Sequence, residues 1–168
     1  MQTVSDDELQ QLTLDMSYLL RQKRWQLSSS ESCTGGWLAK CCTDLEGSSA
    51  WFERGFVSYS NQSKHDLLAV KQATLDQFGA VSEATVIEMV QGALNHSQAD
   101  ISVAITGIAG PTGGTVDKPV GTVWFAWTSQ YAKVHTRCHH LSGDRDQVRR
   151  QAVAIAVIGI AEYIEATK

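Results

Sequence analysis

Basic residues are scarcer than acidic ones in this chain. Its 168 residues include 14 lysines and arginines against 18 aspartates and glutamates, which gives a formal net charge of -4 and a pI near 5.7. Proteins that bind nucleic acid irrespective of its sequence need a basic face. The charge balance therefore argues against nucleic acid as a partner, although it leaves room for a local basic pocket that binds one phosphate.

The cysteines lack the spacing of redox or metal-binding motifs. The chain has four, none of them in a C-x-x-C pair: Cys33, Cys41, Cys42 and Cys138. Residues 1–9 are polar and acidic, unlike a signal peptide. The sequence therefore predicts a cytoplasmic protein with reduced thiols.

Long apolar runs are missing as well. The most apolar segment, residues 152–160, is too short for a membrane span and follows Arg149 and Arg150. We therefore expect no membrane association. A hydrophobic content of 43% and a charged content of 19% are typical of a globular protein. The length suits a single domain, residues 1–168.

Hydrophobic periodicity indicates helices that alternate with strands. Helical patterns cover residues 6–23, 34–43, a short stretch after Ser60, 74–78 and 82–95. A last helix can start at Ser142 or Asp144 and runs to about residue 166. Strand patterns cover residues 25–30, 51–59, 101–106, 121–128 and 132–141, and the last two read as a hairpin. Residues 107–119 read as a loop rich in glycine, proline and threonine. The order predicts an α/β protein, a three-layer α/β/α sandwich with a mixed sheet.

The segment Ser30–Gly36 is a hydroxyl-rich and glycine-rich turn between a predicted strand and a predicted helix. Such a turn places side-chain oxygens and backbone N–H groups at a helix N-terminus, which favours negative charge. It suits phosphate binding or a serine nucleophile beside an oxyanion hole. An ordinary strand-to-helix turn has a similar composition.

Polar residues follow three of the predicted strands. Ser32 and Thr34 follow the first strand, Tyr59 and Lys64 follow the second, and Thr106 ends the third. Ligands of open α/β sheets bind outside the carboxyl ends of strands, so these residues are candidates for one site. Each also has a purely structural interpretation, as a helix cap, a strand residue, a solvated lysine or a sheet-end hydroxyl.

The five histidines do not suit a Ser-His-Asp triad. His135 and His139 alternate with Arg137 on one face of a predicted strand, which indicates solvent rather than catalysis. The spacing of Cys138, His139 and His140 is poor for zinc, so no metal site is expected. A serine nucleophile would need another base, and a lysine whose pKa is lowered by desolvation can serve. Lys64 is the candidate.

The Gly107–Gly114 loop lacks the Gly-Lys-Ser/Thr ending of a Walker A motif. Its glycines allow backbone N–H groups to approach a ligand closely, and Gly107 and Gly110 are candidate contacts. Arg145, near the start of the last predicted helix, is a candidate for phosphate binding. A surface loop and a surface arginine are the alternatives.

Together these motifs resemble one family, the CinA C-terminal domain family of nicotinamide-nucleotide amidohydrolases, in stand-alone form. The resemblance covers nearly the whole chain. It rests on segments Glu31–Gly36, Gly47–Asn61 with Lys64, Gly79–Ser82, Gly107–Pro111, Lys118–Val123 and Ser142–Arg145.

The resemblance implies hydrolysis of nicotinamide mononucleotide to nicotinate mononucleotide and ammonia, without a metal or organic cofactor. It implies a mixed, mostly parallel five-stranded sheet in an α/β/α fold. Homo-oligomer formation stays open. Ser32, Lys64 and Tyr59 match the family's catalytic positions, and Ser49 and Ser30 compete with Ser32 as nucleophile. The expected substrate contacts are Ser30, Thr34, Gly35, Gly36, Thr106, Gly107, Gly110 and Arg145.

Two other functions fit the same residues. One is a nucleotide-binding module without catalysis, and the other is a serine amidase for a different small amide.

Ser29 and Ser30 stand where the family pattern leads us to expect Thr-Ala, which adds hydroxyls at the site.

Overall fold

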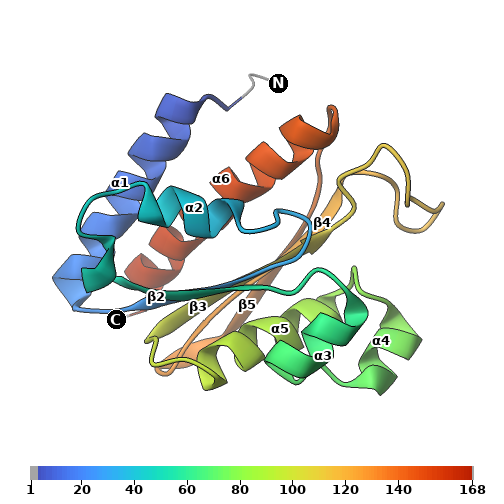
Figure 1. Cartoon of the computed structure of the whole chain (residues 1–168), viewed down its shortest axis with the longest axis horizontal. Helices are drawn as coiled ribbons and strands as arrows, with labels where there is room; N and C mark the ends of the chain where they lie inside the picture. Colours follow the sequence, from blue (N-terminus) through green and yellow to red (C-terminus); the bar gives the residue numbers. More distant parts are fainter. Residues whose placement is uncertain (1–3, 168) are drawn as a thin grey trace.

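A five-stranded sheet in the order β2-β1-β3-β4-β5 divides the molecule into layers (Figure 1). The computed structural model describes residues 4–167. The strands are β1 (Leu27–Glu31), β2 (Phe52–Val57), β3 (Ile101–Gly107), β4 (Thr122–Ser129) and β5 (Ala132–His140). The helices are α1 (Asp6–Lys23), α2 (Trp37–Thr43), α3 (Asn61–Leu68), α4 (Gln72–Phe78), α5 (Glu83–Asn95) and α6 (Arg145–Ala166).

The sheet is mixed. Strand β1 pairs in parallel with β2 and β3, whereas β4 pairs antiparallel with both β3 and β5. Four of the five strands thus run in the same direction, and only half of the pairings are parallel. The predicted sandwich with a mixed, mostly parallel sheet is confirmed.

Helices cover both faces of the sheet. Helices α1, α2 and α6 lie on one face and α3, α4 and α5 on the other (Figure 1). Strand β3 shows how the two cores are separated: Val103 and Ile105 pack with the first group, and Ala104 packs with Val86 and Met89 of α5. No helix among residues 4–167 is long and apolar enough to span a membrane.

The helix starts follow their capping residues. Ser5 and Glu8 form a capping box at α1, Ser60 caps α3, and Asp144 forms a second box at α6. Helix α2 begins at Trp37 rather than at residue 34, because Gly35 and Gly36 adopt φ values of 62° and 95°. Such positive values suit glycine and interrupt a right-handed helix.

The solvent-facing side expected for β5 is largely confirmed. His135 and Arg137 are exposed and His139 is partly buried, on the side of the strand that faces α6. The His135 ring meets Tyr163 edge-on at 5.6 Å, and Arg137 forms an ion pair with Glu162 at 2.7 Å. Strand β5 is at the sheet edge, so this face stays partly open even though α6 approaches it.

Candidate active site

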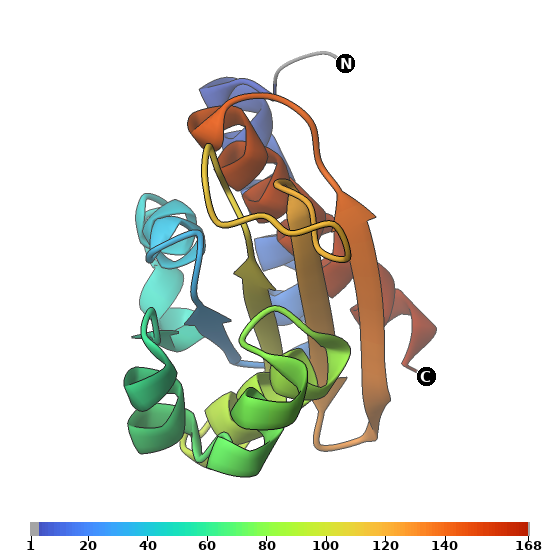
Figure 2. The same cartoon turned by 90° about the vertical axis from the view of Figure 1, so that its right-hand side faces the viewer.

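The candidate site lies at the carboxyl ends of three parallel strands, the side of the molecule that faces the viewer in Figure 2. Ser32 directly follows β1, Lys64 lies on the helix that follows β2, and Thr106 is near the end of β3. Because β1 pairs in parallel with both neighbours, these three ends meet at one edge of the sheet. The structure thus brings Ser32 and Lys64 together from positions 32 residues apart.

Lys64 is fully buried, and all three hydrogen-bonding positions of its amine are occupied. Its Nζ lies 3.0 Å from Ser32 Oγ, 2.8 Å from the carbonyl oxygen of Ser58 and 3.2 Å from that of Tyr59. Lys64, the candidate base, therefore lies within hydrogen-bond distance of Ser32. Two of the three partners are carbonyls, which only accept hydrogen bonds. A neutral amine would therefore donate to the carbonyls and turn its lone pair to the Ser32 hydroxyl.

Burial lowers the pKa of Lys64 from 10.5 to about 8. Desolvation disfavours the charged form, and within residues 4–167 no carboxylate forms an ion pair with this amine. Burial likewise raises the pKa of the neighbouring Cys33 thiol to about 12, so this thiol is neutral at physiological pH. With a pKa of about 8, roughly a tenth of the Lys64 amine is unprotonated at pH 7, and only this neutral form can accept a proton.

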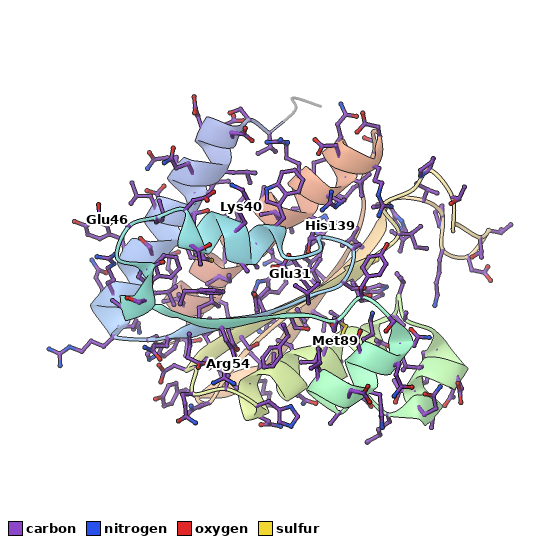
Figure 3. All side chains as sticks on the ribbon, in the orientation of Figure 1. Glu31, Lys40, Glu46, Arg54, Met89 and His139 are labelled. Carbon is purple, nitrogen blue, oxygen red and sulfur yellow. The ribbon has the colours of Figure 1, made fainter. Side chains whose placement is uncertain are left out.

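Glu31 holds the start of α2 in place. Its carboxylate is buried between α2 and the sheet (Figure 3) and accepts hydrogen bonds from the backbone N–H groups of Gly36, Leu38 and Ala39 at 2.9 to 3.1 Å. A carboxylate that accepts several N–H groups satisfies donors that a helix start leaves without partners. Glu31 thereby fixes the segment that follows Ser32.

The turn after Ser32 leaves two backbone donors without partners. The Gly35 N–H donates to the Ser32 carbonyl at 3.1 Å, and the Gly36 N–H is taken by Glu31. In the described chain the N–H groups of Cys33 and Thr34 have no acceptor in another residue. Of the expected contacts in this turn, Gly35 and Gly36 thus have their N–H groups occupied by internal hydrogen bonds, whereas the N–H group of Thr34 is available to a ligand.

Arg145 joins two parts of the rim of the site. Its guanidinium donates to the Gly110 carbonyl at 2.8 Å and lies 3.4 Å from the Tyr59 hydroxyl. The side chains of Arg145 and Tyr59 are exposed. Tyr59 therefore meets Lys64 through its carbonyl oxygen and meets Arg145 through its hydroxyl.

Other expected contacts have structural roles or no partner. The Thr106 hydroxyl donates to the Ala80 carbonyl at 2.8 Å. The buried Ser30 and Thr34 hydroxyls lack partners among the described residues. At Gly107 a Cβ atom would come within 2.7 Å of Val123, so the backbone there packs too closely for a side chain.

The structure does not bring Ser49 to this site. Ser49 lies in a 3-10 turn, Ser48–Ala50, which precedes β2, whereas Lys64 follows the opposite end of that strand. Its side chain is exposed. Phe56 of β2 packs against the core around α5.

A cavity of about 900 Å³ adjoins the site on the other side of the turn. It lies among α1, α2 and α6, and its lining includes Thr34, Gly35, Trp37, Arg149 and Arg150. The turn that follows Ser32 thus separates Lys64 from this cavity.

Metal-ligating side chains do not gather anywhere in the described part of the chain. Within residues 4–167 no group of three or more His, Cys, Asp or Glu residues could hold a metal ion. The expectation that the activity needs no metal stays a prediction.

Two residues of the site were missed by sequence reasoning. Glu31 was counted only as part of a motif, although its place directly before a predicted turn and helix is a signal for a cap of α2. Arg149, whose guanidinium reaches the same turn, lies more than 110 residues away in the chain. No local pattern links it to Ser32.

Comparison with known proteins agrees with this architecture. Residues 9–164 match the model of the CinA C-terminal domain. Nicotinamide-nucleotide amidohydrolase PncC of Escherichia coli K12 is 53% identical over 154 residues, which span 92% of this chain and 93% of that protein. PncC of Enterobacter agglomerans is 47% identical over 163 residues, which span 96% and 99% of the two chains.

Solved structures show the same fold. The crystal structure of a CinA superfamily protein from Klebsiella pneumoniae superimposes with a TM-score of 0.90 at 38% identity, over 94% of this chain and 98% of the other. A competence/damage-inducible protein from Agrobacterium tumefaciens gives 0.89 at 36% identity, over 98% and 99%. By its sequence and by its fold, the chain belongs to the CinA C-terminal domain family.

Proposed function

We propose that this protein hydrolyses the carboxamide of nicotinamide mononucleotide, giving nicotinate mononucleotide and ammonia, with Ser32 as nucleophile and Lys64 as base. Relatives that match nearly the full length of the chain carry the name nicotinamide-nucleotide amidohydrolase. The observation that carries the mechanism is the 3.0 Å distance between Lys64 Nζ and Ser32 Oγ at a fully buried amine.

The first half of the reaction forms an acyl-enzyme. Neutral Lys64 takes the proton of the Ser32 hydroxyl while Ser32 Oγ attacks the carboxamide carbon. The carbonyl oxygen becomes an oxyanion, which the N–H groups of Cys33 and Thr34 stabilise. The intermediate then collapses, the C–N bond breaks, and protonated Lys64 returns its proton to the departing amide nitrogen, which leaves as ammonia.

The second half regenerates the enzyme. Lys64, neutral again, takes a proton from water, and the resulting hydroxide attacks the nicotinoyl ester of Ser32. The ester bond breaks, Ser32 Oγ recovers the proton from Lys64, and nicotinate mononucleotide leaves. One water is consumed for each ammonia released. No step needs a metal or an organic cofactor.

The substrate phosphate is assigned to the rim. Arg145 is exposed, charged and held by Gly110 and Tyr59, so its guanidinium stands at the mouth of the site with donors still available. The glycines of the Gly107–Gly114 loop offer backbone N–H groups beside it. The cytoplasmic location expected from the sequence accords with this substrate and stays a prediction.

Ammonia release from a panel of amides tests the proposal. Nicotinamide mononucleotide, its dephosphorylated riboside, nicotinamide and unrelated small amides are compared at several pH values. We expect turnover of the mononucleotide, with kcat rising with pH through about 8 as Lys64 loses its proton.

Three results would contradict the proposal. Binding of the mononucleotide without ammonia release would indicate a binding module, and preference for an unrelated amide would indicate a different amidase. A kcat that falls as pH rises from 7 to 9 would exclude neutral Lys64 as the base.

A further inference from the structure

Arg149 contacts the turn that carries the nucleophile. From α6, its Nε donates to the Cys33 carbonyl at 3.0 Å and its Nη2 donates to the Thr34 carbonyl at 3.1 Å. Its guanidinium also lies over the Trp37 ring, 5.2 Å from the ring centre. One side chain thus forms hydrogen bonds with two successive carbonyls directly after Ser32.

The turn needs such an outside contact. Ser32 to Gly35 form a four-residue turn, closed by the hydrogen bond from the Gly35 N–H to the Ser32 carbonyl. The central peptide of this turn, between Cys33 and Thr34, makes no hydrogen bond within the turn. Its orientation is what distinguishes the common turn types, so a flip of this peptide changes where its N–H group points.

The Cys33 carbonyl and the Thr34 N–H belong to this same planar trans peptide and point in opposite directions. When Arg149 holds the carbonyl toward α6, the Thr34 N–H is directed away from α6. This N–H is one of the two backbone donors beside Ser32 that have no acceptor in another described residue.

We propose that Arg149 is a positioning residue, which fixes the Cys33–Thr34 peptide so that the Thr34 N–H is aligned as an oxyanion donor beside Ser32. The proposal rests on the proposed amide hydrolysis. Arg149 touches neither Ser32 Oγ nor Lys64, so it acts through the turn. A lysine in its place would keep the charge but could not hold two carbonyls in a fixed fork.

Arg150 provides a matched control. It is the next residue of α6 and lies over the same Trp37 ring at 4.9 Å, but it pairs with Asp6 and Asp146 instead of the turn. We expect Arg149→Lys to lower kcat by about 10²-fold, the scale of one lost oxyanion donor, with KM changed less than twofold. Arg150→Lys should keep the wild-type kcat.

Chemical rescue separates positioning from packing. Arg149 lines the 900 Å³ cavity, so Arg149→Ala opens a space that small guanidinium compounds can reach. Methylguanidine, at concentrations too low to unfold the protein, should restore part of the kcat of Arg149→Ala. It should leave Arg150→Ala and the wild type unchanged.

Nuclear magnetic resonance gives a readout that does not depend on turnover. We expect the Thr34 amide signal to shift and split or broaden in Arg149→Lys, as the peptide samples two orientations, and to stay single in Arg150→Lys. If the wild type releases no ammonia from any amide, the proposed function fails, while this signal still decides whether Arg149 fixes the turn. A wild-type kcat in Arg149→Lys, or an unchanged Thr34 signal, would overturn the proposal.

Discussion

At the scale of single residues, Ser32 and Ser49 differ in what surrounds their hydroxyl groups. The Ser32 hydroxyl meets a buried amine, whereas the Ser49 side chain is exposed before β2. We expect Ser32→Ala to lower kcat by at least about 10³-fold with substrate binding retained, because the group that attacks the amide is lost. Ammonia release and equilibrium binding of the mononucleotide measure the two effects.

Ser49→Ala is the matched control, since it removes the same atom from the other candidate serine. It should keep the wild-type kcat. A dead Ser49→Ala with an active Ser32→Ala would place the nucleophile at the opposite end of the sheet and refute the dyad.

The proposed contact between Arg145 and the substrate phosphate can be tested by removing either partner, the side chain or the phosphate. We expect Arg145→Gln to lower kcat/KM for the mononucleotide by about 10- to 100-fold, since a charge-assisted hydrogen bond contributes roughly 1.5–3 kcal/mol. The dephosphorylated riboside should react poorly with the wild type and lose little more in the variant. Steady-state kinetics with all four combinations isolates the contact, and equal losses for both substrates would show that Arg145 does not bind the phosphate.

Whether a site residue could be predicted from the sequence depended on where the residue that it contacts lies in the fold. Ser32, Lys64 and Tyr59 follow neighbouring strands, so the rule that ligands bind at carboxyl ends of strands brought them together. Arg149 escaped prediction because its contact with the turn is made across two layers of the fold. The carbonyls of Ser58 and Tyr59, which accept hydrogen bonds from Lys64, could not be predicted either. Every residue has a carbonyl, and only the folded structure brings these two to the amine.

At the scale of elements, α2 depends on one carboxylate. The helix has seven residues, too few to be stable alone, and Glu31 accepts hydrogen bonds from two of its N–H groups and from that of its N-cap residue. We expect Glu31→Gln to lower the free energy of unfolding by about 2–3 kcal/mol, because an amide has a single acceptor oxygen and adds N–H donors facing others. Urea unfolding measures the loss.

Glu46 is the control for this prediction. It is exposed in the loop after α2, on the outside of the molecule (Figure 3), so Glu46→Gln should change stability by less than about 0.5 kcal/mol. Equal stability of the two variants would mean that Glu31 does not anchor α2.

Most elements could be predicted because their signals are local. Caps such as Ser60, Ser82 and Asp144 mark three helix starts, and apolar alternation marks the hairpin. The late start of α2 could not be predicted. It follows from the positive φ values of two successive glycines, and glycine can adopt such values but does not have to. On β5 the expected solvent exposure of His135 and Arg137 is confirmed, whereas their contacts with α6, distant in the chain, could not be predicted from the strand pattern.

At the scale of the whole molecule, the buried amine of Lys64 links stability to pH. Its pKa falls from 10.5 in the unfolded chain to about 8 in the folded protein, so the unfolded chain binds more protons between these values. Stability contributed by this group therefore rises with pH across the window and is constant below it. We expect the wild type to gain about 3 kcal/mol relative to Lys64→Met between pH 8 and 10.5.

Urea unfolding of wild type and Lys64→Met across this pH range measures the difference between their free energies of unfolding. The contributions of the other titrating groups are the same in both proteins and cancel in this difference. Lys133→Met, which removes an exposed lysine from β5, should show no such gain. A constant difference between wild type and Lys64→Met would mean that the folded protein keeps Lys64 at its ordinary pKa.

The burial of Lys64 also bears on synthesis at the ribosome. Ser32 and Lys64 emerge in the first part of the chain, whereas Arg145 and Arg149, which hold the rim and the turn, emerge with the last helix. Until the sheet and its helices have assembled, Lys64 is an ordinary solvated lysine and Ser32 an ordinary alcohol. The proposed dyad therefore exists only in the folded protein, and α6 adds the contacts of Arg145 with the rim and of Arg149 with the turn.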